Sequence, residues 1–261
     1  LNATVAFAFV QQLGAGMVIP VLIGWSLREL PERFRGRGMG WWCTGTVIAK
    51  RLVLTAAHCV SDAFVGQGFV WSVFAGYRFS ADPASLIPVK KRMMHPRFDL
   101  NNVVAGYDFG AVVTENALPV APLAVHREPM GDGDVGKQVR VIGFGLTSYG
   151  VTSSFGTRRE VTSEIEEVTD LLITYSSLAP AACGGDSGGP LLMAFGGGDE
   201  VVAIHSYTDG DKCEGPDHDG RVDVALPFID PIIADADPGY VPPDLGVAGP
   251  DLAAATGADG A

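Results

Sequence analysis

A serine enclosed by glycines stands in the stretch Cys183-Gly184-Gly185-Asp186-Ser187-Gly188-Gly189-Pro190. Glycine lacks a Cβ, so it adopts positive φ and lets a substrate carbonyl approach the backbone closely. The pattern is typical of a sharp turn that presents a hydroxyl, and we interpret Ser187 as a candidate nucleophile. If the amides of Gly185 and Ser187 converge, they form an oxyanion hole. Loss of one such donor lowers the rate of the catalysed reaction by about 10²–10³-fold.

A serine hydroxyl attacks only when a base lies within hydrogen-bond reach and an acid orients that base. His58, in Thr55-Ala56-Ala57-His58-Cys59, is the candidate base, because an imidazole takes and returns a proton near neutral pH. Asp108, in the apolar run Tyr107–Val113, is the candidate acid, because a carboxylate in such a run requires hydrogen bonds. Taken alone, His58 also fits a structural histidine, and Asp108 also fits a solvated aspartate at the end of a strand.

The four cysteines, at positions 43, 59, 183 and 213, lack the close spacing of zinc ligands, so no metal is expected. An even number in a chain rich in loops suits two disulfides and an oxidising compartment. Three pairings are open, of which the simplest joins the neighbours in sequence, Cys43 with Cys59 and Cys183 with Cys213.

Short β-branched runs separated by turn residues must position these side chains. They indicate an all-β fold of antiparallel strands, because alternation of strands with long helices is missing. The expected strands are Met17–Ile23, Thr46–Thr55, Phe69–Phe74, Ile87–Met93, Phe109–Val113, Gln138–Ile142, Leu171–Tyr175, Pro190–Ala194, Val201–Ser206 and Arg221–Leu226. A loop at Arg127–Gly136 divides them into two halves, which we interpret as two sub-barrels at about 17–126 and 137–226. A short helix is expected from about Pro227 to Ala236, and residues 238–261 are expected to form a flexible tail.

The net charge of −12 and the pI near 4.7 argue against nucleic acid and anionic membranes as partners, since both repel an acidic surface. No apolar run reaches the roughly 18–20 residues that span a bilayer. We expect a monomer without a transmembrane segment, and we expect that any secretory signal has been removed.

In combination, these motifs resemble those of the trypsin/chymotrypsin-like serine peptidases. The strings around His58 and Ser187 resemble the family's histidine and serine motifs, and Asp108 lies in a segment similar to its Asp-Ile-Ala-Leu. Further matches are Cys43–Ile48 and Gly143-Phe144-Gly145. The resemblance covers roughly residues 20 to 235.

The resemblance implies two six-stranded antiparallel β-barrels with a short C-terminal helix, in a peptidase domain at 1–237. It implies a secreted or otherwise extracytoplasmic endopeptidase of peptides or proteins that needs no cofactor. His58 acts as the base, Asp108 orients it, and Ser187 forms the acyl-enzyme. The pairs Cys43–Cys59 and Cys183–Cys213 match two of the family's disulfides.

The primary specificity pocket departs from the trypsin pattern, because Ala181 stands where trypsin-type members have aspartate. The pocket residues implied by the resemblance are Ala181, Ala182, Ser206, Tyr207, Thr208 and Gly220. Thr208 narrows the pocket, so we expect small to medium apolar residues at P1. The alternative is that one of the acids at the rim reaches inward and restores a preference for basic residues; these are Asp209, Asp211, Glu214, Asp217, Asp219 and Asp223.

Activation in the family commonly inserts a new Ile-Val-Gly-Gly terminus against the aspartate before the serine, here Asp186. The chain lacks this tetrapeptide, and Leu1-Asn2-Ala3-Thr4 is a candidate variant of it. Alternatively, residues 1–15 extend the first strand.

Two rival functions remain at this point. Gly185–Gly189 also fits the G-x-S-x-G elbow of α/β-hydrolase esterases, although that fold needs the order serine, acid, histidine. The other rival is a catalytically silent binding or regulatory protein on the trypsin-like fold. The remaining histidines, His95, His126, His205 and His218, are expected to be structural or exposed.

Overall fold

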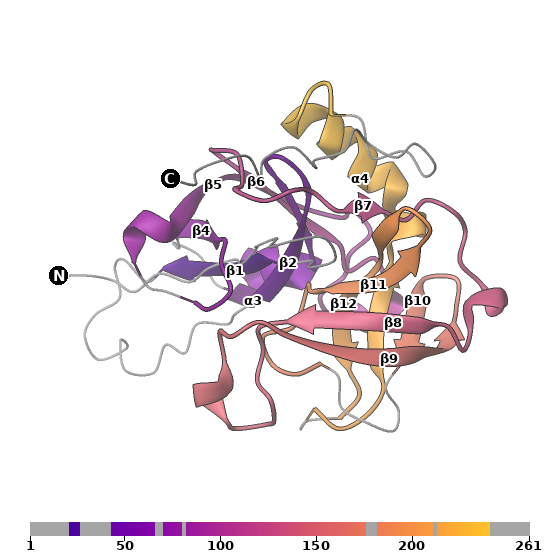
Figure 1. The fold of residues 1–261 in the computed structure, drawn as a ribbon. Helices are drawn as coiled ribbons and strands as arrows, with labels where there is room; N and C mark the ends of the chain where they lie inside the picture. The colour runs from indigo at the N-terminus through magenta and orange to yellow at the C-terminus, as the bar shows by residue number, and fades with distance from the viewer. Residues whose placement is uncertain are drawn as a thin grey trace, which may run out of the picture.

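The structure, a computed structural model, describes residues 21–26, 43–65, 70–79, 82–175, 182–210 and 213–240. Its strands form two mainly antiparallel barrel-like sheets that occupy separate halves of the molecule (Figure 1). The first is a closed barrel in the order β1-β2-β3-β6-β5-β4. Its strands are β1 (Val21–Ser26), β2 (Cys43–Ala49), β3 (Leu52–Thr55), β4 (Val70–Phe74), β5 (Leu86–Met94) and β6 (Gly110–Thr114).

The second sheet has the order β11-β8-β9-β10-β13-β12-β7, and β11 also pairs with β12, so that the sheet curls on itself. Its strands are β7 (Ala124–Val125), β8 (Gln138–Gly143), β9 (Arg159–Val168), β10 (Leu172–Tyr175), β11 (Pro190–Phe195), β12 (Gly198–Thr208) and β13 (Asp217–Arg221). The short helices are α2 (Ala57–Val60), α3 (Asp62–Val65) and the 3₁₀ turns η1 (Pro83–Ser85), η2 (Val103–Ala105), η3 (Asp132–Asp134) and η4 (Thr152–Ser154). The expected all-β fold of two barrels with a C-terminal helix is confirmed. This fold excludes the α/β-hydrolase alternative, which requires a sheet alternating with helices.

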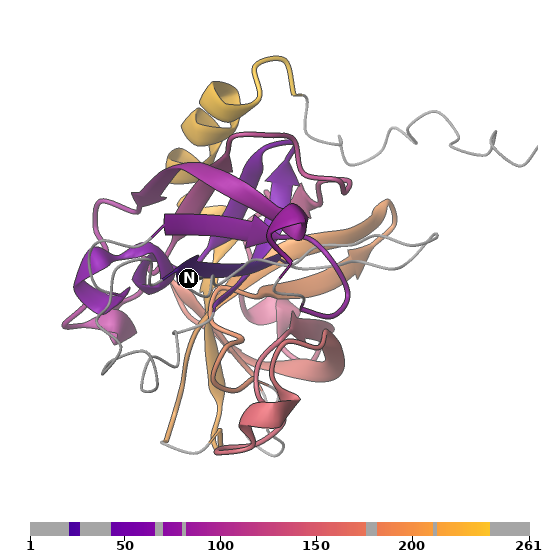
Figure 2. The same cartoon turned by 90° about the vertical axis from the view of Figure 1, so that its left-hand side faces the viewer.

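The C-terminal helix α4 (Val222–Ala236) lies at one edge of the molecule (Figure 2), and its buried face packs against residues of both barrels. Its buried residues recur at a spacing of three or four, which gives one apolar face. This face joins a core cluster that contains Leu54 and Phe109 of the first barrel region and Ile142 and Ile204 of the second sheet. The helix therefore holds together the two halves that carry the candidate site.

The helix begins earlier than expected, and the predicted strand at Arg221–Leu226 is wrong. Only Arg221 belongs to a strand, β13, and the chain turns helical at Val222. Pro227 and Pro231 lie inside the helix on its exposed side, four residues apart. Each proline removes one backbone donor and crowds the preceding turn, and burial of the opposite face outweighs this local penalty.

The expected strand Thr46–Thr55 is two strands, β2 and β3, joined by a turn. Three strands were missed: β7, which has only two residues, and β9 and β13, whose sequences are polar. β9 has mostly exposed side chains, and β13 reads Asp-His-Asp-Gly-Arg although four of its five residues are buried. Residues 17–20 of the first expected strand and most of the expected tail lie outside the described residues. The proposed domain boundaries stay a prediction.

Candidate active site

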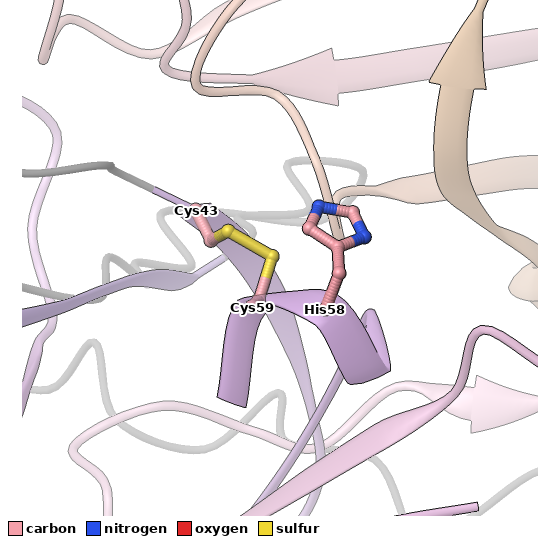
Figure 3. Close-up of side chains that lie close together, drawn as sticks. All are labelled: Cys43, His58 and Cys59. Atoms are coloured by element: carbon pink, nitrogen blue, oxygen red, sulfur yellow. A yellow bond between two sulfur atoms is a disulfide. The ribbon is translucent and has the colours of Figure 1, made fainter. Parts of the chain in front are cut away.

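His58 lies on α2, which follows directly after β3 of the first barrel. A disulfide between Cys43 and Cys59, with Cα atoms 6.0 Å apart, ties this helix to the start of β2 (Figure 3). The imidazole is buried and meets the ring of Phe64 edge to face, with centroids 5.2 Å apart. The covalent link and the packing fix the position of the ring.

Asp108 is buried and accepts three hydrogen bonds. His58 reaches it with its backbone N–H, 2.9 Å from Oδ1, and with Nδ1, 2.7 Å from Oδ2. The hydroxyl of Ser206 donates to Oδ2 at 2.6 Å. Burial by itself raises the pKa of the Asp108 carboxyl, but the charge of His58 and these hydrogen bonds outweigh it and lower the pKa below its ordinary value. Asp108 is therefore an ionised acceptor, and Nδ1 of His58 carries a proton.

The turn before Asp108 has an unusual backbone. Tyr107 adopts φ of 61° in the left-handed region, which residues other than glycine rarely occupy. Its ring stacks on His95 with centroids 5.0 Å apart, and the guanidinium of Arg97 lies 3.9 Å from the ring centroid. These contacts hold a turn whose strain costs about 1–3 kcal/mol, and the turn delivers Asp108 to His58.

The Ser187 loop belongs to the second sheet but is bound to the first barrel. The backbone N–H of Thr44 donates to the Ser187 carbonyl at 2.7 Å, and Sγ of Cys59 lies 3.6 Å from the same oxygen. A Cβ on Gly188 would lie 2.0 Å from Oγ1 of Thr55, so only glycine allows this approach. The loop is thereby held beside the segment that carries His58.

The peptides before Ser187 are also fixed. The carbonyl of Gly184 accepts from the N–H of Leu146 at 3.0 Å, and the carbonyl of Gly185 accepts from Oγ1 of Thr44 at 2.9 Å. Gly185 has φ of 104°, a conformation that favours glycine. Both carbonyls are thus directed to neighbouring elements.

Asp186 is buried in a cradle made by the end of β8. Its carboxylate accepts from the N–H of Gly145 at 2.7 Å and from that of Cys183 at 3.0 Å. Burial raises the pKa of Asp186 to about 6, although these two hydrogen bonds and the charge of His205 oppose the rise. A cavity of about 330 Å³ is lined by Asp186, Gly143, Gly145, Arg159 and the cystine of Cys183 and Cys213. Leu1, its predicted partner, lies outside the described residues.

The predicted pocket residues Ala182, Ser206, Tyr207, Thr208 and Gly220 come from three neighbouring segments, and Ala181 lies outside the described residues. The disulfide Cys183–Cys213, with Cα atoms 5.0 Å apart, joins the segment after Ala182 to the loop between β12 and β13. The N–H of Ala182 and Oγ1 of Thr208 both donate to the buried carboxylate of Asp217, at 3.1 and 2.5 Å. Ser206 is bound to Asp108, so it belongs to the histidine and aspartate group as well as to the predicted pocket.

On the same strands, β12 and β13, lies a buried polar network that the sequence did not reveal. Nδ1 of His205 lies 2.8 Å from Oδ1 of Asp219, and the hydroxyl of Tyr175 donates to the same oxygen at 3.0 Å. Burial lowers the pKa of His205, but the carboxylates of Asp219, Asp217 and Asp186 outweigh it and raise the pKa to about 9. His205 is therefore a buried cation at neutral pH, and its backbone N–H and carbonyl bind Gly189 and Gly188 beside Ser187.

Cys43, His58 and Cys59 offer ligand atoms that all lie within 4.8 Å of one another. Both sulfurs are joined in the disulfide, as Figure 3 shows, so they are not thiolates and do not form a metal centre in this state.

The structure brings His58 and Asp108 together and holds the Ser187 backbone against the same barrel. Both disulfides pair as the resemblance implied. Sequence reasoning missed the roles of Ser206, His205, Asp217 and Asp219 in this region. Asp217 and Asp219 stand two residues apart, which places both on one face of a strand and was the signal available for them, whereas His205 and Ser206 offered none.

Residues 32–229 match the profile of the trypsin family. Brachyurin of Leptuca pugilator is 28% identical, over 72% of this chain and 86% of that protein. Chymotrypsin of Phaedon cochleariae is 28% identical, over 59% of this chain and 59% of that protein, so the chain spans about three fifths of this relative. Human heparin binding protein, a solved structure, has a TM-score of 0.60 over 84% of this chain and 94% of that chain at 19% identity, which is a likeness of fold alone. Among the helices of the described part of the chain, none is long and apolar enough to cross a membrane.

Proposed function

Because the chain belongs to the trypsin family, we propose that it is a serine endopeptidase that hydrolyses peptide bonds through an acyl-enzyme intermediate. Ser187 is the nucleophile, His58 the general base and then the general acid, and Asp108 the group that orients His58. The observation that carries this proposal is the buried pair of His58 and Asp108, with the Ser187 loop hydrogen-bonded to the same barrel.

The protonation of His58 supports its role as the base. Nδ1 is committed to the ionised Asp108, so Nε2 is the nitrogen that is free to accept a proton. When Nε2 takes the proton of the Ser187 hydroxyl, the ring becomes a cation beside a carboxylate, which stabilises it. Ser206 keeps the carboxylate in place by its third hydrogen bond.

The backbone around Gly185 supports an oxyanion hole formed by the amides of Gly185 and Ser187. In a trans peptide the N–H and the C=O point in opposite directions. The Gly184 carbonyl points to Leu146, so the N–H of Gly185 points away from Leu146. Such fixed donors are set before the reaction and cost no reorganisation during it.

The two disulfides and the family's relatives favour an extracytoplasmic protein, and we propose that it is secreted and acts as a monomer on protein or peptide substrates. For activation, we propose that an α-amino group such as that of Leu1 binds Asp186. The cavity that opens onto this carboxylate is the feature of the structure that supports such a contact.

A fluorophosphonate probe, which modifies activated serines, tests the proposal. We expect the wild-type protein to be labelled and the Ser187→Ala variant to remain unlabelled, with the same circular dichroism spectrum. Ser153→Ala, which changes an exposed serine, is the matched control and should be labelled like the wild type. Absence of labelling in well-folded wild-type protein would favour a catalytically silent protein on this fold.

A further inference from the structure

The turn before Asp108 contains residues that take no part in the proposed chemistry. Tyr107 has φ of 61°, and Gly106 before it has φ of 81°. Glycine adopts such a conformation without strain, but tyrosine does not. A strained residue persists at a functional site only where its surroundings hold it. The contacts of the Tyr107 side chain therefore indicate why a tyrosine occupies this position.

Two side chains hold the ring of Tyr107. The ring stacks on the imidazole of His95, with an angle of 18° between the two planes and centroids 5.0 Å apart. The guanidinium carbon of Arg97 lies 3.9 Å from the centroid of the same tyrosine ring, within the range of a cation–π contact. Tyr107 is only half-buried, so these two contacts restrict a ring that the core does not enclose.

His95 is itself held by several segments. Its backbone N–H donates to the carbonyl of Phe109 at 2.8 Å, and its Nδ1 accepts from the N–H of Arg97 at 3.2 Å. Its ring meets Phe228 of α4 edge to face, with centroids 5.2 Å apart. Burial and the charge of Arg97 lower the pKa of His95, which keeps Nδ1 available as an acceptor. The imidazole is thus a fixed surface against which the Tyr107 ring packs.

The backbone carries the position of Tyr107 directly to Asp108. The carbonyl of Tyr107 accepts from the N–H of Phe109 at 2.8 Å, which closes a tight turn with Asp108 at its centre. The carboxylate of Asp108 has to meet three donors, at distances from 2.6 to 2.9 Å. Hydrogen bonds weaken steeply when their angles change, so a small rotation of this turn would misalign the carboxylate with His58.

We propose that Tyr107 is a positioning residue, whose ring, held by His95 and Arg97, fixes the turn so that Asp108 orients His58. The inference rests on the proposed peptidase function. It states that the site requires the aromatic ring and tolerates the backbone strain that comes with it. A residue that suits φ of 61° but has no ring would therefore relieve the strain and still weaken the site.

Tyr107→Gly separates the ring from the backbone conformation. Because glycine adopts this φ without strain, relief of strain offsets part of the lost ring contacts, and we expect a folded protein. We expect kcat for a peptide substrate to fall by at least about tenfold with KM little changed, because the orientation of His58 is affected and substrate binding is not. Tyr107→Phe keeps the ring and should retain the wild-type kcat.

Tyr77→Gly is the matched control. The ring of Tyr77 also lies near an arginine, with the guanidinium carbon of Arg158 5.8 Å from its centroid, and the residue is 54% exposed. The same substitution at this position should leave kcat unchanged. Wild-type kcat in Tyr107→Gly would overturn the inference, and so would equal losses in Tyr107→Gly and Tyr107→Phe.

A spectroscopic measurement separates this inference from the proposed function, because it needs no catalysis. A proton in a short hydrogen bond to a carboxylate resonates at low field, so proton NMR of the Ser187→Ala protein should show the Nδ1 proton of His58. In this background Tyr107→Gly should shift that resonance upfield or abolish it, whereas Tyr107→Phe should leave it unchanged.

A milder variant covers the case in which Tyr107→Gly does not fold. Arg97→Gln removes the cation over the ring but keeps the backbone N–H that donates to His95. It should shift the His58 resonance in the same direction. An unchanged resonance in the folded variants would refute the positioning role of Tyr107, whatever the fluorophosphonate experiment shows.

Discussion

Asp108 illustrates how one residue depends on several parts of the fold. Its carboxylate accepts from the backbone and the ring of His58 and from the hydroxyl of Ser206, which comes from the second sheet. Both barrels therefore contribute to the orientation of a single imidazole. The geometry requires an acceptor at this position, because a donor there would invert the hydrogen bond to Nδ1.

Asp108→Asn tests this requirement. The amide preserves the shape but presents a donor, so it favours the tautomer with the proton on Nε2 and removes the base. We expect kcat/KM for peptide hydrolysis to fall by about 10⁴-fold with little change in KM. Asp170→Asn, at an exposed position, is the control and should retain wild-type activity. Retention of full activity by Asp108→Asn would contradict the assigned role.

At this scale the sequence was informative where a short motif surrounds the residue. His58, Asp108 and Ser187 each stand in a recognisable string. Ser206 and His205 stand in the plain segment Ile204–Tyr207, and their partners lie 98 and 14 residues away in the chain. Only the pairing of strands brings such residues together, so local patterns did not identify them.

At the scale of elements, the end of β8 shows why Gly143 and Gly145 flank Phe144. A Cβ built on Gly143 would lie 1.8 Å from Oδ1 of Asp186, and one on Gly145 would lie 2.5 Å from Oδ2. The missing side chains are the space that the buried carboxylate occupies. The turn of the Ser187 loop depends on this space, since Asp186 directly precedes the serine.

Gly143→Ala should therefore displace Asp186. The added methyl group overlaps the carboxylate, and such overpacking costs about 1–3 kcal/mol. We expect a lower melting temperature and a fluorophosphonate labelling rate reduced by at least about tenfold, measured on the same preparation. Gly133→Ala, where a Cβ would meet nothing within 4 Å, is the control for the substitution itself. Wild-type labelling by Gly143→Ala would show that the loop does not depend on this cradle.

The elements that sequence patterns failed to predict share a physical cause. β13 lacks apolar alternation because its buried side chains belong to a polar network, and hydrophobic periodicity does not detect such a strand. α4 contains two prolines, which ordinarily break a helix, and tertiary burial of its other face overrides them. Strands with regular apolar residues, such as Pro190–Phe195, were found in nearly the right place.

On the scale of the whole molecule, polar contacts hold the segment that links the two barrels to the second sheet and to α4. β7 pairs with β12 in parallel. Next to this pairing, Nδ1 of the buried His126 lies 2.7 Å from Oε2 of Glu200, and the imidazole stacks on the ring of Phe195. Arg127 binds Asp230 of α4 with two hydrogen bonds. Each disulfide closes a loop within one half of the molecule. The relative position of His58 and Ser187 thus depends on noncovalent packing between the two halves.

The acidity of the chain and its buried charges make overall stability depend on pH. The folded protein raises the pKa of His205 to about 9, above its ordinary value of 6.5. The groups that face the imidazole are the carboxylates of Asp219, Asp217 and Asp186, with Tyr175 behind Asp219. The folded state holds a proton that the unfolded state has released, so the unfolding free energy decreases as the pH rises from about 6.5 to about 9. The decrease should be about 3 kcal/mol.

The interval from pH 6.5 to 9 reports on His205 together with its partner Asp219, whose pKa burial also raises against the charge of His205. Asp186, Asp108 and Tyr175 titrate outside this interval. The pKa of Asp186 is raised to about 6, so its contribution to the unfolding free energy is lost as the pH rises from about 4 to about 6. The pKa of Asp108 is lowered, so its contribution is lost as the pH falls below about 4. Burial raises the pKa of the Tyr175 hydroxyl well above 10, so it does not titrate in this interval either. Urea unfolding at a series of pH values should therefore show a falling free energy for the wild type and a nearly flat one for His205→Gln. Asp219→Asn keeps the histidine but removes the carboxylate nearest to it, so its slope should lie between the two; parallel curves for all three proteins would show that His205 is not the buried cation.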